Sequence, residues 1–170
     1  GAVPRCFVMR QKRIAAIHDI SGFGKCSLTV VLPILSAAGI ETSVMPTAVL
    51  STHTGGLGKC TYRDLTEDMR DYAAHWKSLN LSFDALYTGF LGSAEQIGIV
   101  SDIVDDFRTS DTLVMVDPVL ADNGKLYATC TPEMAHGMKT LCKKADLIVP
   151  NLTEAAFLLG EEFYDGPYDR

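Results

Sequence analysis

Short runs of β-branched and other apolar residues alternate along the chain with longer segments in which apolar residues recur at helical spacing. Because turn-forming residues separate the two kinds of segment, the short runs are predicted to be strands. The run Thr112–Val116 is apolar throughout, as is typical of a strand that is buried on both faces. The predicted strands are Arg13–His18, Thr42–Leu50, Phe83–Thr88, Thr112–Val116 and Ala145–Val149.

Two of the longer segments begin with the spacing of a capping box. In this motif a small polar residue and an acidic or amide residue three positions later satisfy each other's backbone N–H groups at a helix start. Asp64 and Glu67 have this spacing, and Ser93 and Gln96 repeat it. The two helices are predicted at residues 64–79 and 93–108.

Glycine and proline mark the remaining helices. Pro33 lies inside the first of them and is expected to kink or delay it, whereas Pro132 suits the first turn of another. Gly39 and Gly160 directly follow the first and the last of these segments, and glycine commonly ends a helix. The segments are Ser27–Ala38, one that begins at Thr131, and Thr153–Leu159.

Five repeats of strand followed by helix predict right-handed βαβ units. The expected fold is therefore α/β with three layers, in which helices cover both faces of a mostly parallel sheet. At 170 residues the chain is long enough for one domain with a core of its own. Residues 1–12 are interpreted as an N-terminal extension or a remnant of cloning, and residues 13–170 as the domain.

Polar residues follow every predicted strand at its carboxyl end. In open parallel α/β sheets, ligands bind in the crevice beyond these ends. Polar side chains at all five positions therefore predict one shared binding site. The positions are Asp19, Ser51–Gly56, Gly89–Ser93, Asp117–Asp122 and Asn151–Glu154.

Composition narrows the class of ligand. The net charge of −6 offers no basic surface for nucleic acid or an anionic membrane, and no apolar run approaches the length of a membrane span. The first twelve residues lack the apolar region of a secretory signal. Five cysteines without a C-x-x-C pair favour reduced thiols over a disulfide framework or a zinc site. We expect a cytoplasmic protein that binds small molecules, with no nucleic-acid or membrane partner.

The glycine-rich segment Ser21–Ser27 (SGFGKCS) matches neither of two well-known phosphate-binding motifs. A Walker A loop requires glycine in place of Asp19 and a hydroxyl residue in place of Cys26. A dinucleotide-binding fingerprint requires a third glycine in place of Ser27. What remains is a tight strand-to-helix turn, whose glycines either let the backbone approach a ligand or only form the corner.

Two further polar segments allow a structural and a binding interpretation. Ser51–Gly56 is either a loop capped by its own hydroxyls or a polar binding loop, and His53 within it has no evident partner for a role as a base. Asp117 and Asp122 suit Mg²⁺ on a bound nucleotide, but Asp122–Gly124 (D-N-G) alternatively forms an Asx turn.

The last polar segment lies at a strand-to-helix junction. Thr153 either caps the helix, with Glu154 favouring its positive end, or the junction serves a metal. In the second interpretation Asn151 and Glu154 present a carboxamide and a carboxylate to a hydrated cation. Both interpretations remain open at this point.

Taken together and in this order, the segments resemble the ribokinase-like superfamily, and specifically the front part of its vitamin B6 (pyridoxal/pyridoxamine) kinase branch. The resemblance runs from about Arg13 to Gly160. Each segment alone is weak, but five in the family's order and spacing are specific. The segments are IHDISGFGKCSLTVVLPILSAAGI, PTAVLSTHTGG, YTGFLGS, VDPVLADNGKLY and VPNLTEAAFLLG.

The resemblance implies a role for three residues on the vitamer side of the site. Asp19 stands where these kinases contact the pyridine ring or its substituents. Thr54 matches a substrate contact, and Phe90 matches the aromatic residue that packs against the pyridine, which is often tyrosine in the family.

On the nucleotide side, the resemblance places Asp117 and Asp122 near the ATP phosphates and Mg²⁺. Tyr127 matches a residue close to nucleotide and substrate, and Asn151 and Glu154 match an N-x-x-E motif that organises Mg²⁺ and its waters. Asp117, Asp122 and Glu154 are therefore expected to hold Mg²⁺, partly through water.

The chain departs from the family pattern at three points. Ala121 replaces the usual glycine before Asp122, so the turn there is expected to differ in shape. Val149 stands where threonine often occurs, which leaves a monovalent cation as an open option. The G-T-G-D segment, which supplies the anion hole and the catalytic base, does not occur in these 170 residues. The C-terminal part of the fold, the base and most of the adenine pocket are therefore expected beyond Arg170.

For the intact enzyme, the resemblance implies transfer of the γ-phosphoryl group of ATP to the 5′-hydroxymethyl group of pyridoxal, pyridoxamine or pyridoxine. The 170-residue chain alone is expected to be inactive, because it contains no catalytic residue for this step. A hydroxymethylpyrimidine (phosphate) kinase is the nearest enzymatic alternative, although its first loop normally carries a longer Gly/Ala-rich run. A non-catalytic B6-binding or scaffolding protein is the alternative from another class. Family analogy suggests a homodimer.

Overall fold

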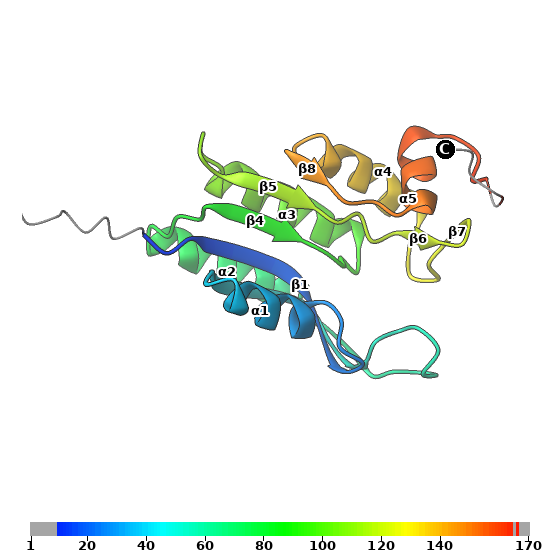
Figure 1. Cartoon of the computed structure of the whole chain (residues 1–170), viewed down its shortest axis with the longest axis horizontal. Coiled ribbons are helices and arrows are strands. Elements are labelled where there is room, and N and C mark those ends of the chain that lie inside the picture. The colour runs from blue at the N-terminus through cyan, green and yellow to red at the C-terminus, as the bar shows by residue number, and fades with distance from the viewer. Residues whose placement is uncertain (1–9, 165, 167–170) are drawn as a thin grey trace, which may run out of the picture.

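The computed structural model describes residues 10–164 and 166, which form a six-stranded sheet, a two-stranded hairpin and five helices (Figure 1). The strands are β1 Arg13–Phe23, β2 Glu41–Thr52, β3 Tyr62–Asp64, β4 Ala85–Thr88, β5 Leu113–Val116, β6 Ala121–Asp122, β7 Lys125–Leu126 and β8 Leu147–Ile148. The helices are α1 Leu28–Ala37, α2 Thr66–Ser78, α3 Ala94–Phe107, α4 Pro132–Cys142 and α5 Leu152–Leu159.

The strands of the sheet lie in the order β3-β2-β1-β4-β5-β8, and β6 pairs with β7. The five strands from β2 to β8 in this order run parallel, and β3 is antiparallel to β2. The five predicted strands are thus all present as β1, β2, β4, β5 and β8. Figure 1 shows their carboxyl ends on the side where β6, β7 and the start of α5 lie.

Helices cover both faces of the sheet. Ala15 and Ile17 of β1 are fully buried in the larger core cluster, together with residues of α2, α3 and α4. Ala16, which lies between them and points to the opposite face, packs with Leu28 and Val31 of α1. Such alternation is expected of a strand that is covered on both sides. The predicted three-layer α/β fold with a mostly parallel sheet is confirmed.

Helix α3 supplies more buried residues than any other helix in the described part of the chain. Burial of each large apolar side chain stabilises the fold by about 1.5–3 kcal/mol. The apolar stripe of α3 consists of Ile97, Val100, Ile103, Val104 and Phe107, at spacings of three and four residues. No helix among the described residues is long and apolar enough to cross a membrane.

Strand β1 extends five residues beyond its predicted end at His18. The pairing of β1 with β2 shifts register between His18 and Ile20, and Pro46, the partner of His18, has no N–H for a regular ladder. After this shift the pairing continues as far as Phe23. Asp19 and Ser21 therefore lie buried inside the strand, whereas the sequence predicted that Asp19 comes after it.

Three short strands were not predicted. All three residues of β3 are exposed, so β3 has no hydrophobic alternation to indicate a strand. β6 and β7 form a two-residue hairpin whose central residues, Asn123 and Gly124, both have positive φ angles (50° and 74°). This is the conformation of a type I′ turn, which Asn-Gly favours. Asp122–Gly124 thus contains a turn, but not the predicted Asx turn, because the N–H of Gly124 donates to Thr153 Oγ1 at 3.1 Å and not to Asp122.

Two predicted helix starts are confirmed. Ser93 Oγ accepts a hydrogen bond from the backbone N–H of Gln96 at 3.1 Å, and Thr131 Oγ1 accepts one from the N–H of Met134 at 3.2 Å. The reciprocal half of the predicted Ser93–Gln96 box is absent, because Gln96 Oε1 accepts the backbone N–H of Gly92 and not that of Ser93.

The predicted Asp64–Glu67 capping box is wrong. The residue before α2 is Leu65, which provides no side-chain cap. Asp64 is the last residue of β3, and its Oδ1 atom accepts a hydrogen bond from the N–H of Thr66 at 2.8 Å. An Asx-type bond of this kind competes with the capping box for the same short acidic side chain.

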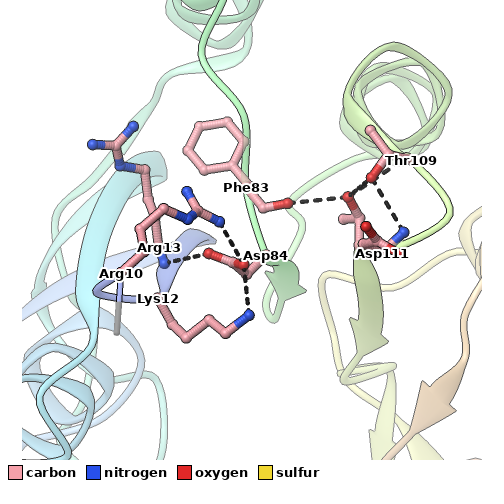
Figure 2. A network of polar contacts seen from close by, with 8 residues as sticks. Arg10, Lys12, Arg13, Phe83, Asp84, Thr109 and Asp111 are labelled. Atoms are coloured by element: carbon pink, nitrogen blue, oxygen red, sulfur yellow. Dashed lines mark hydrogen bonds and ion pairs between the residues drawn. The ribbon is translucent and has the colours of Figure 1, made fainter. Parts of the chain in front are cut away.

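At the amino end of the sheet, Asp84 fastens the start of β1 to β4 (Figure 2). Its carboxylate accepts hydrogen bonds from Arg10 Nη2 at 2.7 Å, from Lys12 Nζ at 2.9 Å and from the backbone N–H of Arg13 at 2.8 Å. These bonds lower the pKa of Asp84, and the bond from Arg13 contributes most. Most of the predicted N-terminal extension, residues 1–12, lies outside the described residues, and the domain boundary stays a prediction.

Candidate functional site

A cavity of about 490 Å³ opens at the carboxyl ends of the central strands, where the sequence predicted a shared site. Its volume is in the range of small-molecule pockets. Two other hollows, of about 280 and 320 Å³, are smaller and lie along α2 and near the start of β5. Of the eight predicted site residues, five line the cavity: Asp19, Thr54, Phe90, Asp122 and Tyr127.

Asp19 provides a buried carboxylate on the cavity wall. Its side chain is 4% exposed, and its Oδ2 atom accepts a hydrogen bond from Ser21 Oγ at 3.1 Å. No ion pair among the described residues involves Asp19. A buried carboxylate without a cationic partner has capacity to accept a hydrogen bond from a ligand, above all from a charged N–H group.

Phe90 lines the cavity from the segment between β4 and α3, and buried polar contacts fix its backbone. Thr47 Oγ1 donates a hydrogen bond to the carbonyl of Phe90 at 2.9 Å. Two positions later, the N–H of Gly92 donates to Oε1 of Gln96 at 2.7 Å. Gln96 is fully buried, and its Nε2 atom donates to the carbonyl of Thr47 at 2.9 Å and to Thr66 Oγ1 at 3.1 Å.

The His18 side chain packs against Gly89, at the start of the segment that carries Phe90. The ring is 3% exposed and meets Tyr87 edge-on, with centroids 4.4 Å apart. Burial lowers the pKa of His18 to about 4, so the ring is neutral. A Cβ atom on Gly89 would lie 2.0 Å from His18 Nδ1, which explains why the residue before Phe90 is glycine.

Thr54 and Tyr127 lie at the exposed margin of the cavity. Thr54 belongs to the loop between β2 and β3, and Tyr127, which is 38% exposed, follows β7. Burial raises the pKa of Tyr127, and the charge of Asp122 adds to the effect. Tyr127 is anchored through its backbone N–H, which donates to the carbonyl of Leu120 at 2.9 Å.

The cavity lining does not include three of the predicted site residues, Asp117, Asn151 and Glu154. Asn151 and Glu154 instead connect the start of α5 to the segment that follows β5. The Asn151 and Glu154 side chains form a capping box at the start of α5, so Asn151, and not Thr153, is the N-cap. Glu154 is 3% exposed and its second oxygen accepts a hydrogen bond from the N–H of Leu120 at 3.0 Å. Asn151 Nδ2 donates to the carbonyl of Ala121 at 2.8 Å. This segment therefore caps α5, but the prediction that Thr153 is the capping residue is wrong.

Two acidic side chains interact electrostatically at this junction. Partial burial raises the pKa of Asp117 to about 6, and the negative charge of Glu154 adds to the effect. The exposed Asp122 bonds instead to the backbone N–H of Asn123 at 2.8 Å.

The described residues contain no group of three or more His, Cys, Asp or Glu side chains that could hold a metal ion by themselves. The chemistry nevertheless fits Mg²⁺. A positive ion would relieve the repulsion between Asp117 and Glu154, and Mg²⁺ usually takes only one or two carboxylates and completes its shell with water and phosphate oxygens. The metal role of Asp117, Asp122 and Glu154 stays a prediction.

Comparison with known proteins assigns the chain to a family. The family model described as phosphomethylpyrimidine kinase matches residues 35–167, which is most of the chain. The chain belongs to the phosphomethylpyrimidine kinase family. Seven of the eight predicted site residues of this family member lie within the matched region, and Asp19 precedes it.

Solved structures of similar proteins share this fold. A candidate phosphomethylpyrimidine kinase of Bacteroides thetaiotaomicron, solved with pyridoxal, is 50% identical with a TM-score of 0.89, over 94% of this chain and 55% of its own. The pyridoxal kinase of Lactobacillus plantarum is 34% identical with a TM-score of 0.86, over 92% and 56% of the two chains. The resemblance to ribokinase-like pyridoxal kinases is thus confirmed.

A curated relative completes the comparison. The pyridoxine/pyridoxal/pyridoxamine kinase of Bordetella avium is 28% identical over 88% of this chain and 52% of its own length. This member of the phosphomethylpyrimidine kinase family therefore spans about half the length of the curated relatives that it matches.

The sequence predictions missed several residues that line the cavity. Cys26 and Ser27 were considered only as failures of a phosphate-binding motif, and His53 was set aside for want of a partner. Val119 lies within the predicted segment Asp117–Asp122, and Thr129 lies two positions after Tyr127, but neither was named as a site residue. The lining residues that were not predicted as site residues are Ser21, Cys26, Ser27, Leu50, His53, Gly55, Val119, Ala128 and Thr129.

Proposed function

We propose that this chain provides the vitamer-binding part of a kinase that transfers the γ-phosphoryl group of ATP to the 5′-hydroxymethyl group of pyridoxal, pyridoxamine or pyridoxine. The observation that carries the proposal is the grouping of Asp19, Thr54 and Phe90 around one cavity of about 490 Å³. A carboxylate, a hydroxyl and an aromatic ring are the groups that a protonated, substituted pyridine ring would require. The pyridoxal in the structure of the Bacteroides relative, at 50% identity, supports this choice of ring.

In the proposed mechanism, Phe90 stacks on the pyridine ring, while Asp19 and Thr54 hold its polar atoms and orient the 5′-hydroxyl group. Correct orientation of this kind supplies much of the rate in phosphoryl transfer.

The acidic junction between β5 and α5 would serve the nucleotide side. Mg²⁺, when bound, neutralises charge on the phosphates of ATP. Asp117, Asp122 and Glu154 would hold it, partly through water. Asn151 keeps Glu154 in place through the capping box, and Tyr127 would lie close to the nucleotide.

The family resemblance implies that the catalytic base and the anion hole would lie beyond Arg170. We therefore propose that the 170-residue chain alone has negligible kinase activity. The homodimer, the cytosolic location and a monovalent cation stay predictions. Size-exclusion chromatography with light scattering would test the homodimer.

A phosphotransfer assay tests the proposed function directly. Protein that includes the sequence following Arg170 should phosphorylate pyridoxal, pyridoxamine or pyridoxine in preference to hydroxymethylpyrimidine, and Asp19→Asn should lower kcat/KM by about a hundredfold, against no change in the exposed control Asp102→Asn. Preference for hydroxymethylpyrimidine would support the enzymatic alternative. Binding of a vitamer without any transfer would support the non-catalytic alternative.

A further inference from the structure

His53 lines the cavity, and one of its ring nitrogens is occupied by a hydrogen bond from the protein. Its Nδ1 atom accepts a hydrogen bond from the backbone N–H of Gly55 at 3.0 Å. An accepting Nδ1 means that the proton of the neutral ring is on Nε2. No hydrogen bond among the described residues uses the Nε2–H group. The neutral ring therefore has one N–H donor, at Nε2, that could bond to a ligand.

The glycine-rich turn fixes the position of this ring. The backbone N–H of His53 donates to the carbonyl of Phe23 at 3.1 Å, which places the ring against the next residue, Gly24. A Cβ atom at Gly24 would lie 2.0 Å from His53 Cδ2 and 2.8 Å from Nε2, and Gly24 has a φ angle of +81°. Glycine is thus needed here so that an imidazole can approach the backbone.

His53 and Asp19 line the same cavity and have complementary hydrogen-bonding character. Asp19 is acidic and accepts hydrogen bonds, whereas Nε2–H of His53 donates one. In water near neutral pH the ring of a B6 vitamer is mainly a zwitterion, with a protonated ring nitrogen and an ionised ring oxygen. A cavity with a carboxylate and a separate N–H donor matches both charges of such a ring.

Building on the proposed function, we propose that His53 donates a hydrogen bond from Nε2 to the ionised ring oxygen of a bound B6 vitamer and thereby selects 3-hydroxypyridines. An aminopyrimidine has no ionised ring oxygen, so it would leave this donor without a partner in the cavity. A site built to bond a polar group discriminates strongly against a ligand that lacks it. His53 is therefore assigned as a specificity-determining residue and not as a base.

A ligand pair that differs by one oxygen tests this inference. Titration calorimetry would measure pyridoxine and 3-deoxypyridoxine binding to the chain and to His53→Ala. We expect the substitution to weaken pyridoxine binding by about tenfold and 3-deoxypyridoxine binding by less than about twofold. Equal losses for the two ligands, or no loss for either, would overturn the inference, because His53 would then act only on the fold or not at all.

Two conservative variants separate the ligand bond from the bond to Gly55. Gln places an N–H group near the position of Nε2, whereas Asn places an acceptor near the position of Nδ1. We expect His53→Gln to retain more of the preference for pyridoxine over its 3-deoxy analogue than His53→Asn does, and the reverse order would contradict the assignment. If the unsubstituted chain binds neither ligand, the proposed function itself fails. If it binds both equally well, only the role of His53 fails.

Discussion

Glu154 and Leu120 are joined by a hydrogen bond of 3.0 Å from the backbone N–H of Leu120 to Oε1 of the carboxylate, across 34 positions of sequence. The other carboxylate oxygen accepts the N–H of Asn151 at 2.9 Å. One buried side chain thus satisfies two backbone donors from different segments. It holds the start of α5 against the residues that follow β5, which is where the proposed nucleotide side of the site begins.

Replacement of Glu154 by alanine should therefore destabilise the fold. Two N–H groups would lose their acceptor in a buried position, at a cost of about 2–5 kcal/mol in the free energy of unfolding. Glu154→Gln keeps one acceptor and should cost less, and the exposed control Glu161→Gln should stay within about 0.5 kcal/mol. Urea denaturation measures all three, and equal stability of Glu154→Ala and the unsubstituted chain would contradict the structural role.

Asp117 should make the stability of the chain depend on pH. Its pKa is raised from 3.8 to about 6 in the folded state, so folding favours the protonated carboxyl group. The stabilising effect of protonation is complete below pH 3.8 and is lost as the pH rises through about 6. At neutral pH, Asp117→Asn should be the more stable protein by about 1–2 kcal/mol, after allowance for solvent screening of a partly exposed group.

Carbon-detected NMR of the side-chain carboxyl group would give the titration of Asp117 directly. The expected midpoint is about 6, and Glu154→Gln should lower it because the charge of Glu154 contributes to the shift. A midpoint at the ordinary value of 3.8 would contradict both the burial of the Asp117 carboxyl group and its interaction with Glu154.

Gln96 should be needed to hold the Phe90 segment. In Gln96→Leu, the N–H of Gly92 and the carbonyl of Thr47 would lose their buried partner, at a cost of about 2–4 kcal/mol. Gln11 is a matched control, since its exposed amide makes one hydrogen bond, to the carbonyl of Gly39 at 3.1 Å. Gln11→Leu should change stability by less than about 0.5 kcal/mol. Similar thermal unfolding of the two variants would argue against the role of Gln96.

Gly24 and Gly56 provide a test of the contact between His53 and the glycine-rich turn. Both have positive φ angles, +81° and +74°, so alanine is strained by a similar amount at either position. A Cβ atom would meet His53 at Gly24 but nothing within 4 Å at Gly56. Gly24→Ala should therefore be less stable than Gly56→Ala by about 1–3 kcal/mol in chemical denaturation. Equal losses would mean that the imidazole does not lie against Gly24.

The parts of the fold that the sequence predicted are those with a local signal. The apolar run Thr112–Val116 forms β5 as predicted, but only one of its faces is fully buried, since Leu113 on the other face is 47% exposed. Ser93 caps α3 through a bond that spans three residues. Asn-Gly at 123–124 forms the turn that its conformational preference favours. In each of these segments the residue pattern that indicates the structure lies within a few consecutive residues.

The parts that escaped prediction depend on contacts between distant segments. Asp19 lies inside β1 because pairing with β2 extends the strand, and no local pattern reports that pairing. Gln96 was assigned half of a capping box, yet its side chain bonds to Thr47, 49 positions away. His53 acquires its place only when the β2–β3 loop meets Gly24. The sequence therefore predicted that the candidate site lies at the carboxyl ends of the strands. It did not predict the buried hydrogen bonds that hold the site in place.

Binding of pyridoxine to the 170-residue chain is the measurement that tests the central claim most directly. Titration calorimetry should show saturable binding at one site. Asp19→Asn should weaken it by at least about tenfold, because the ring nitrogen loses its charged partner. The exposed control Asp102→Asn should bind as the unsubstituted chain does. If the chain shows no binding, or if Asp19→Asn binds with unchanged affinity, the cavity at the ends of β1, β2 and β4 is not the vitamer site.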